Sequence, residues 1–315
     1  MKIRKQEANL IKEENPQKHI EKIGRICYKS EDKITEDSNK VFIKKLYNNN
    51  HHAMLEHYRF IMQVREDIYT ALSAVRPKHV EFSNTTFDGK QRFLISLNAR
   101  ALMNLDRDCI ASKVGVLQMA IINIKEELIG HIIKHYGCYQ LFGYDDGDDL
   151  PMLSTGVEFI ENSLNAMTDE EWYTHGWYSC HFVTDRGISH EIVRHRDETS
   201  FAQESTRYVD YKKDIEFIDQ GFNGDTRDKW IEVCGVIEDI YHYFRNTQNL
   251  APQWARSILP TCLKTEIIMT APIYEWDYFF NLRMRCKAGT AHPMMQELAL
   301  RAYEKMKENG GFGLL

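Results

Sequence analysis

Apolar residues recur every three or four positions in several long segments, which is the spacing of one face of a helix. This pattern predicts helices near residues 17–28, 36–47, 114–132 and 226–244. In the last of these helices, one amphipathic face should be formed by Trp230, Val233, Ile237, Ile240 and Phe244. Long helices are therefore expected in both halves of the chain.

Shorter apolar runs predict strands near residues 60–64, 92–97, 177–183 and 266–270. Asn98 directly follows the second of these runs, and its side chain is suited to cap a helix that begins there. Together, the strands and helices predict an α+β fold. We expect a single mixed α/β domain in which long helices flank a central sheet.

Composition and charge narrow the classes of function. A chain of 315 residues can bury one large core or two small ones. The net charge of −6 argues against sequence-independent nucleic-acid binding, and no apolar run reaches the roughly 18–20 residues of a membrane span. The N-terminus lacks the apolar core of a signal peptide. Seven scattered cysteines without a Cys-x-x-Cys pair favour reduced thiols in a cytoplasmic protein and give no support to a zinc site.

The densest group of chemically active side chains lies between residues 194 and 208. Arg194, His195 and Arg196 stand in a row, and the run Glu-Ser-Thr-Arg-Tyr follows at 204–208. Cations such as these also suit the C-terminus of a helix, but a helix end does not require the second run. Arginine presents a planar fork that grips a phosphate or an imide edge with two hydrogen bonds. The stretch therefore predicts a site for an anionic nucleotide or cofactor.

Three histidines and a glutamate fall within seven residues, at His51, His52, Glu56 and His57. Such a group invites a metal site, but the His-Glu-x-x-His spacing is absent and no second set of ligands is apparent. We therefore expect no bound metal. Two alternatives stay open: a metal-dependent nucleotide phosphohydrolase using His51, Glu56 and His57, and a nucleic-acid-binding module using the arginines of 194–208.

The ordered set of Arg-His-Arg, a spacer of eight residues and Ser-x-Arg-Tyr resembles the signature of the flavin-dependent thymidylate synthases. The segment 51–57 is similar to the histidine segment of that family, and residues 255–260 match its Ala-Arg-x-x-Leu-Pro. The resemblance implies reductive methylation of dUMP to dTMP. Methylenetetrahydrofolate would supply the carbon, FAD would carry the hydride and NADPH would reduce the FAD. It also implies a homotetramer with sites at subunit interfaces.

The resemblance assigns roles to individual residues. It implies that the cofactor is bound by His51, Asn98, Arg100, Arg194, His195, Arg196 and Glu204. It implies that the substrate is bound by Glu191, Glu204, Ser205, Thr206, Arg207, Arg256 and Arg283. Ser205 and Arg283 would act at the reacting centre. No triad spacing surrounds Ser205, so we expect it to position dUMP rather than to attack it.

Two features depart from the pattern of the short family members. Residues from about 75 to 176 resemble the insertion of the longer, phage-like members, which we expect to be largely helical here. Many members place Asn-x-Arg just after the last strand as flavin contacts, whereas Pro272 and Tyr274 take those places in this chain. The same Asn-x-Arg spacing occurs instead after an earlier strand, at Asn98 and Arg100. Either the flavin contacts have moved there, or one strand–helix unit merely echoes the other.

Overall fold

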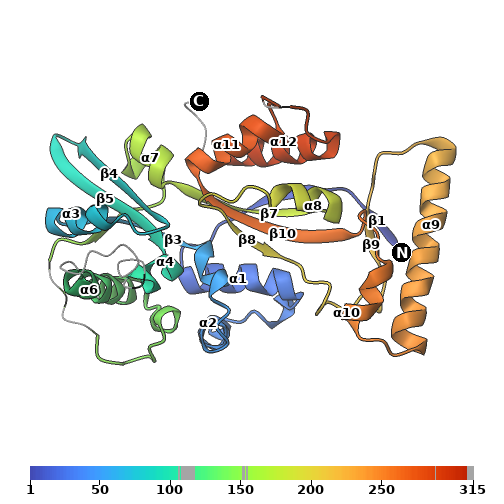
Figure 1. Ribbon diagram of the computed structural model, residues 1–315, viewed down its shortest axis with the longest axis horizontal. Helices are drawn as coiled ribbons and strands as arrows, with labels where there is room; N and C mark the ends of the chain where they lie inside the picture. Colours follow the sequence, from blue (N-terminus) through green and yellow to red (C-terminus); the bar gives the residue numbers. More distant parts are fainter. Residues whose placement is uncertain (106, 108–117, 151–152, 154, 288, 311–315) are drawn as a thin grey trace.

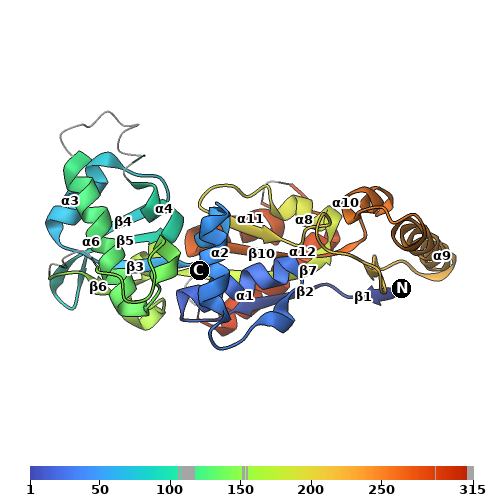
Figure 2. The same cartoon turned by 90° about the horizontal axis from the view of Figure 1, so that it is seen from below.

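A computed structural model describes residues 1–105, 107, 118–150, 153, 155–287 and 289–310. Its strands form three sheets, two of four strands and one of two strands. The two larger sheets lie side by side along the long axis of the molecule, with helices above and below them (Figure 1; Figure 2). The prediction of an α+β fold is confirmed.

The central sheet is antiparallel and has the order β2-β7-β10-β8. These strands are β2 (Glu7–Ile11), β7 (Trp177–Asp185), β10 (Lys264–Pro272) and β8 (Ser200–Gln203). Every residue of β10 is buried, because other strands flank it and helices cover both of its faces. Neighbouring residues on this strand point to opposite faces: Ile267 and Met269 pack in the large core, and Ile268 packs in a smaller core on the other side.

Helices cover both faces of the central sheet (Figure 1). One face carries α8 (Arg186–Ile192), α11 (Ile273–Arg283) and α12 (Pro293–Glu308). The other face carries α1 (Pro16–Tyr28), followed by the 3-10 helix η1 (Glu31–Lys33), α2 (Ser38–Asn48) and the 3-10 helix η2 (His52–His57). Aromatic side chains fill the core between the central sheet and α11, where Phe182, Trp276, Phe279 and Phe280 are fully buried.

The second four-stranded sheet has the order β4-β5-β3-β6. Its strands are β4 (Val80–Phe87), β5 (Lys90–Asn98), β3 (Arg59–Gln63) and β6 (Glu158–Phe159). The helices of this region are α3 (Glu66–Val75), α4 (Ala99–Met103), α6 (Gln118–Tyr136), η4 (Tyr139–Phe142), η5 (Leu164–Ala166) and α7 (Asp169–His175). Segment 75–176 therefore contributes three strands as well as helices.

Local predictions within this region agree with the structure. Asn98 caps α4, because its side-chain oxygen accepts a hydrogen bond of 2.8 Å from the Ala101 amide. On α6, the apolar residues Ile121, Ile124, Leu128 and Ile132 are buried as expected. The first part of that predicted helix, with Val114 and Leu117, lies outside the described residues.

The third sheet stands at the far end of the molecule. It pairs β1 (Lys2–Arg4) in parallel with β9 (Glu216–Ile218) and lies beside α9 (Gly224–His242), the π-helix η6 (Tyr243–Thr247), α10 (Pro252–Ala255) and the 3-10 helix η7 (Arg256–Ile258). Cys234 and Tyr241 of α9 are buried, whereas Val233, predicted on its apolar face, is 55% exposed. The spacing predicted the helix correctly, but α9 packs on its own chain along a narrower stripe that does not include Val233.

Candidate active site

The C-terminal end of α8 anchors a buried histidine. His195 is 5% exposed, and its Nε2 accepts a hydrogen bond of 3.0 Å from Nε of Arg283 at the end of α11. The same guanidinium donates to a Glu191 carboxylate oxygen at 3.1 Å and to the Glu191 carbonyl at 3.2 Å. Burial, and secondarily the Arg283 charge, lower the pKa of His195 to about 4. His195 is therefore neutral near pH 7 and holds Arg283 in place as an acceptor.

The two arginines beside His195 are in a different environment. The helix α8 ends at Ile192, so Arg194 and Arg196 lie in the turn beyond it and are exposed. Neither forms an ion pair with another residue in the described part of the chain. Their guanidinium groups are therefore accessible from solvent.

A short strand separates the two halves of the 194–208 stretch. Ser200–Gln203, within this stretch, form β8 and pair with β10. This strand, roughly 13 Å long at about 3.3 Å per residue, lies between the Arg194–Arg196 turn and the Ser205–Arg207 turn. The two turns consequently face different surroundings.

The turn after β8 brings together several of the predicted substrate residues. Arg256 Nη1 donates to the Thr206 hydroxyl at 3.3 Å, and the Ser205 hydroxyl accepts from the Arg207 amide at 3.4 Å. Ser205 is half-buried, and Arg207 is exposed with its guanidinium 5.4 Å from the ring centre of Tyr208. Arg256 thus places a cation beside the Thr206 hydroxyl, and the Arg207 guanidinium lies over Tyr208 in the same turn.

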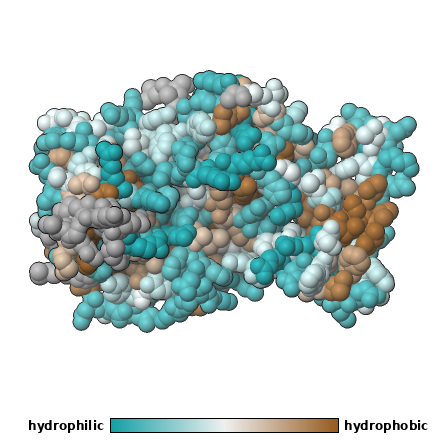
Figure 3. All heavy atoms as spheres, in the orientation of Figure 1, coloured by the Kyte–Doolittle hydropathy of each residue, from teal (hydrophilic) through white to brown (hydrophobic). Residues whose placement is uncertain are grey.

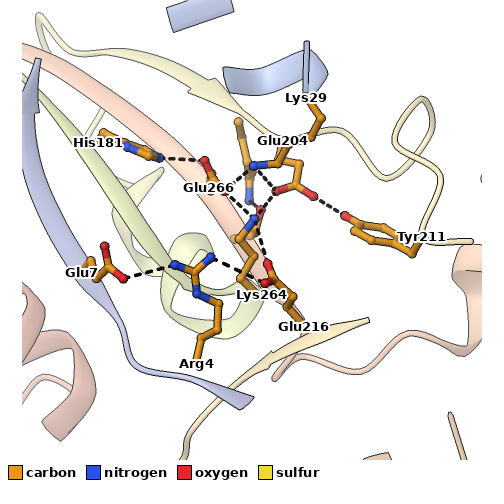
Figure 4. Close-up of polar contacts among 11 residues, drawn as sticks. Arg4, Glu7, Lys29, His181, Glu204, Tyr211, Glu216, Lys264 and Glu266 are labelled. Carbon is orange, nitrogen blue, oxygen red and sulfur yellow. Dashed lines mark hydrogen bonds and ion pairs between the residues drawn. The ribbon is translucent and has the colours of Figure 1, made fainter. Parts of the chain in front are cut away.

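A buried network of charges supports this turn from below (Figure 4). Glu204 is 1% exposed and pairs with Lys264 at 3.2 Å and Lys29 at 3.6 Å, while the Tyr211 hydroxyl donates to it. Lys264 also pairs with Glu266 at 2.5 Å. Burial would lower the pKa of Lys264, but the two carboxylates outweigh it and raise that pKa. Glu204 is fully enclosed by protein, so in this arrangement it fixes the backbone before Ser205.

A basic cavity of about 270 Å³ lies at the end of β5. Its walls include Glu56, Lys78, His79, Asn98, Arg100 and Arg107. Arg100 forms an ion pair with Glu56, and His79 Nδ1 lies 2.9 Å from a carboxylate oxygen of Glu198 in the turn after α8. The hydrogen bond to Glu198 raises the pKa of His79. The cavity is therefore lined by the histidine segment and the Asn98–Arg100 segment, and His79 links its wall to Glu198 in the turn after α8.

The structure separates the histidines that suggested a metal. His51 is exposed just before η2, whereas His57 is fully buried and its Nδ1 lies 2.8 Å from the Thr270 hydroxyl. Glu56 is held by Arg100. Among the residues that the structure describes, no three His, Cys, Asp or Glu side chains are grouped to hold a metal ion.

Four residues of the site were missed by the reasoning from sequence. Lys264 and Glu266 are two positions apart on a strand of apolar residues, so they share one face of that strand. Two charges on a strand buried on both faces must be paired, and this signal could have revealed the network. Lys78 and His79 follow a proline in a polar segment and carry no comparable signal.

Comparisons with known proteins identify the family. The model of the thymidylate synthase complementing protein family matches residues 9–88 and 138–309, so Asn98 and Arg100 lie between the two matched segments. The flavin-dependent thymidylate synthase of Pyrococcus furiosus is 31% identical over 129 residues, which are 37% of this chain and 51% of that protein. The chain thus spans about half the length of this curated relative.

Two crystal structures of thymidylate synthase X from Helicobacter pylori with FAD and dUMP are distant structural matches. They are 17% and 20% identical, cover 43% and 44% of this chain and 70% and 72% of theirs, and give TM-scores of 0.32 and 0.34. The family assignment rests instead on the two long segments matched by the family model. The chain belongs to the thymidylate synthase complementing protein family, as its resemblance to the flavin-dependent thymidylate synthases predicted.

Proposed function

We propose that the protein catalyses the FAD-dependent reductive methylation of dUMP to dTMP, with methylenetetrahydrofolate as carbon donor and NADPH as reductant. Family membership supports the reaction class. The observation that carries the proposal is the basic cavity lined by Glu56 and Arg100 of two predicted cofactor segments, whose wall residue His79 is hydrogen-bonded to Glu198 in the turn after α8. None of the helices in the described ranges is both long and apolar enough to cross a membrane.

The donors of the predicted cofactor segments fit a dinucleotide such as FAD. Arg194 and Arg196 offer exposed guanidinium groups, and Asn98 and Arg100 line the cavity itself. Cations of this kind stabilise a pyrophosphate and a reduced, anionic flavin. We assign these four residues, with His51 and His195, to the cofactor; His195 would act by holding Arg283. Bound FAD would supply the hydride needed to reduce the transferred carbon.

The dUMP site is assigned to the turn after β8 and to the Arg283 group. Arg207 and Arg256 are suited to the phosphate, because each is a permanent cation with several donors. Ser205 and Thr206 would bind the pyrimidine, and Arg283 would meet its polar edge while held by Glu191. The Ser205 hydroxyl accepts from a backbone amide, and no side-chain base among the described residues hydrogen-bonds to it. This geometry supports a positioning role for Ser205.

The first prediction concerns the cofactor. The purified protein should show flavin absorption bands and release FAD on denaturation, because Arg194, Arg196 and Arg100 together offer three cations to a diphosphate. The measurement is the visible spectrum before and after denaturation, with the released flavin identified by chromatography.

A colourless protein that does not take up added FAD would contradict the proposal. Nucleotide hydrolysis that requires a divalent metal would instead favour the phosphohydrolase, an alternative that the separated His51, Glu56 and His57 do not support. A control reaction with dUMP but without methylenetetrahydrofolate should give no dTMP.

The second prediction concerns the substrate. Arg256→Ala should weaken dUMP binding about 10- to 100-fold and leave FAD binding unchanged, because a hydrogen bond to a charged group contributes roughly 1.5–3 kcal/mol. Calorimetric titration of both ligands measures the effect. The matched control is Arg301→Ala, which removes an exposed arginine from α12. Equal dUMP affinity in Arg256→Ala and Arg301→Ala would show that Arg256 does not bind the phosphate.

We also propose a homotetramer. Val233, Val236 and Tyr243 are about half exposed and follow one stripe of α9 and η6, and Figure 3 shows hydrophobic side chains gathered over this end of the molecule. A second copy of the chain would remove this apolar stripe from water. The strand β8 separates the two turns of the 194–208 stretch, which is consistent with sites that neighbouring subunits complete.

A further inference from the structure

The two four-stranded sheets have the same strand arrangement. The second sheet has the order β4-β5-β3-β6, and the central sheet, read from its other edge, has the order β8-β10-β7-β2. All of the neighbouring pairs are antiparallel in both sheets. Along the chain, β3, β4 and β5 follow one another as β7, β8 and β10 do. The correspondence therefore covers every strand of both sheets.

The helices correspond as well. β3 and β7 are each followed by a helix, α3 or α8, which packs against a late helix, α6 or α12. β5 and β10 each lead directly into a helix, α4 or α11. The last residues of these strands, Asn98 and Pro272, both occupy the N-cap position and pair with the first residues of β3 and β7, Arg59 and Trp177. This register makes Arg100 and Tyr274 equivalent.

The strand that precedes each unit along the chain pairs with a strand of the other unit. β2 precedes the first unit but pairs with β7 of the second, and β6 precedes the second unit but pairs with β3 of the first. The helices that follow them are exchanged in the same way, because α1 packs on β8 and α7 packs on β4. The result is a reciprocal strand exchange within one chain.

The ends of the two sheets meet at a junction. Tyr58, just before β3, packs edge-on against Trp177 at the start of β7, with ring centres 5.1 Å apart. His79, just before β4, bonds to Glu198, just before β8, and both residues have positive φ angles of 61° and 44°. Val80 pairs with Leu97 and Ser200 pairs with Thr270, and in the shared register of the two sheets this makes His79 and Glu198 equivalent residues that meet across the junction.

Charge is reversed between the two equivalent ends of the junction. In the first unit, Lys78 and Arg100 line the basic cavity. In the second unit, Asp197 and Tyr274 occupy the equivalent positions, and the Tyr274 hydroxyl donates to Glu81 at 2.8 Å. Burial, followed by the charges of Asp197, Glu198 and Glu81, raises the pKa of Glu275 to about 7. The second end is therefore acidic and unsuited to an anion.

We propose that the β3–α6 and β7–α12 segments are two copies of one unit, joined by exchange of β2 and β6, and that the basic cavity at their junction binds the diphosphate of a nucleotide. The equivalent end of the second copy has lost this capacity. The inference rests on the proposed function for the identity of the nucleotide, a flavin dinucleotide, but its structural argument is independent of that reaction. This proposal explains why Asn98 and Arg100 follow an earlier strand. They belong to the first copy of a repeated unit, and only that copy has the residues that bind the diphosphate.

The test is a calorimetric titration of the full-length protein, freed of flavin, with ADP, inorganic pyrophosphate and FAD. We expect one ADP per chain and at least a fivefold weaker affinity in Lys78→Ala, because this lysine lines the cavity and forms no ion pair with another described residue. The matched control is Lys90→Ala, which removes an exposed lysine at the opposite end of β5 and should bind like the unaltered protein. Circular dichroism checks that both variants are folded.

Three outcomes would overturn the proposal: no binding of ADP or pyrophosphate by the unaltered protein, two ADP per chain, or equal affinities in Lys78→Ala and Lys90→Ala. The FAD arm separates this inference from the proposed function. If the protein binds FAD and ADP with affinities that do not change in Lys78→Ala, the proposed function stands but the cavity is not the diphosphate site. If ADP and pyrophosphate bind in a way that depends on Lys78 but FAD does not bind, the cavity is a diphosphate site and the proposed function is wrong.

Discussion

Lys264→Met is expected to lower the free energy of unfolding by about 3–5 kcal/mol, because two buried carboxylates lose the more buried of the two lysines that they share. The Lys264 ammonium lies between Glu204 and Glu266, and all three residues are less than 10% exposed. Methionine has a similar length, so the change removes the charge with little loss of packing. Urea unfolding followed by circular dichroism measures the difference.

Two comparisons make this test specific. Lys229→Met removes a lysine that is 79% exposed on α9 and should change the unfolding free energy by less than about 0.5 kcal/mol. Adding Glu204→Gln and Glu266→Gln to Lys264→Met should recover part of the lost stability, since the unpaired charges disappear. If Lys264→Met and Lys229→Met were equally stable, the buried network would not contribute as the geometry indicates.

The network also connects stability to the site. Glu204 precedes Ser205, so a shift of its carboxylate moves the turn that carries Ser205 and Thr206. Lys29, from the end of α1, reaches the same carboxylates. The Ser205–Arg207 turn is therefore held by the strand β10 and by the segment that follows α1, and both are distant from this turn in sequence.

Much of the fold could be predicted from local patterns. The strands β7 and β10 are long apolar runs, and α1, α6 and α12 show clear helical spacing, so each follows from its own residues. The strand β4 was missed although Asp88-Gly89 marks the tight turn of a hairpin, with both residues at positive φ. The strand β8 has only four residues and depends on pairing with β10.

The candidate site was predictable to the extent that it consists of contiguous motifs. The residues 194–208, 51–57 and 98–100 each carry a recognisable combination of side chains. Contacts that join them, such as His79 with Glu198, link positions 119 residues apart, and no local pattern encodes that pairing. The echo between the two strand–helix units was visible around Asn98 and Arg100, but their equivalence to Pro272 and Tyr274 required the strand register.

Acidification from pH 7 to pH 5 is expected to destabilise the protein strongly, because four histidines are buried in the neutral form. Burial lowers the pKa of His19 and His175 to about 3 and that of His57 and His195 to about 4. In the unfolded chain their pKa is about 6.5, so below this pH the unfolded state binds more protons than the folded state. Stability is full above pH 6.5 and is lost as the pH falls toward 4.

Each histidine should lower the free energy of unfolding by about 2 kcal/mol at pH 5, since a difference of one pKa unit corresponds to about 1.4 kcal/mol. Glu275 opposes this trend, because its raised pKa of about 7 makes the folded state bind a proton that the unfolded state releases. His79 opposes it as well, because its hydrogen bond to Glu198 raises its pKa in the folded state. These two groups against four histidines leave a large net loss, comparable with the roughly 5–15 kcal/mol of total stability typical of a folded protein.

Urea unfolding at half-unit steps between pH 7.5 and pH 5 measures this dependence, and its slope gives the number of protons taken up on unfolding. His190→Gln is the control, because His190 is exposed on α8 and should leave the slope unchanged. His57→Gln should reduce the slope by nearly one proton, whatever its effect on stability at pH 7.5. A flat stability profile down to pH 5, or equal slopes in the two variants, would mean that these histidines already carry their protons in the folded state.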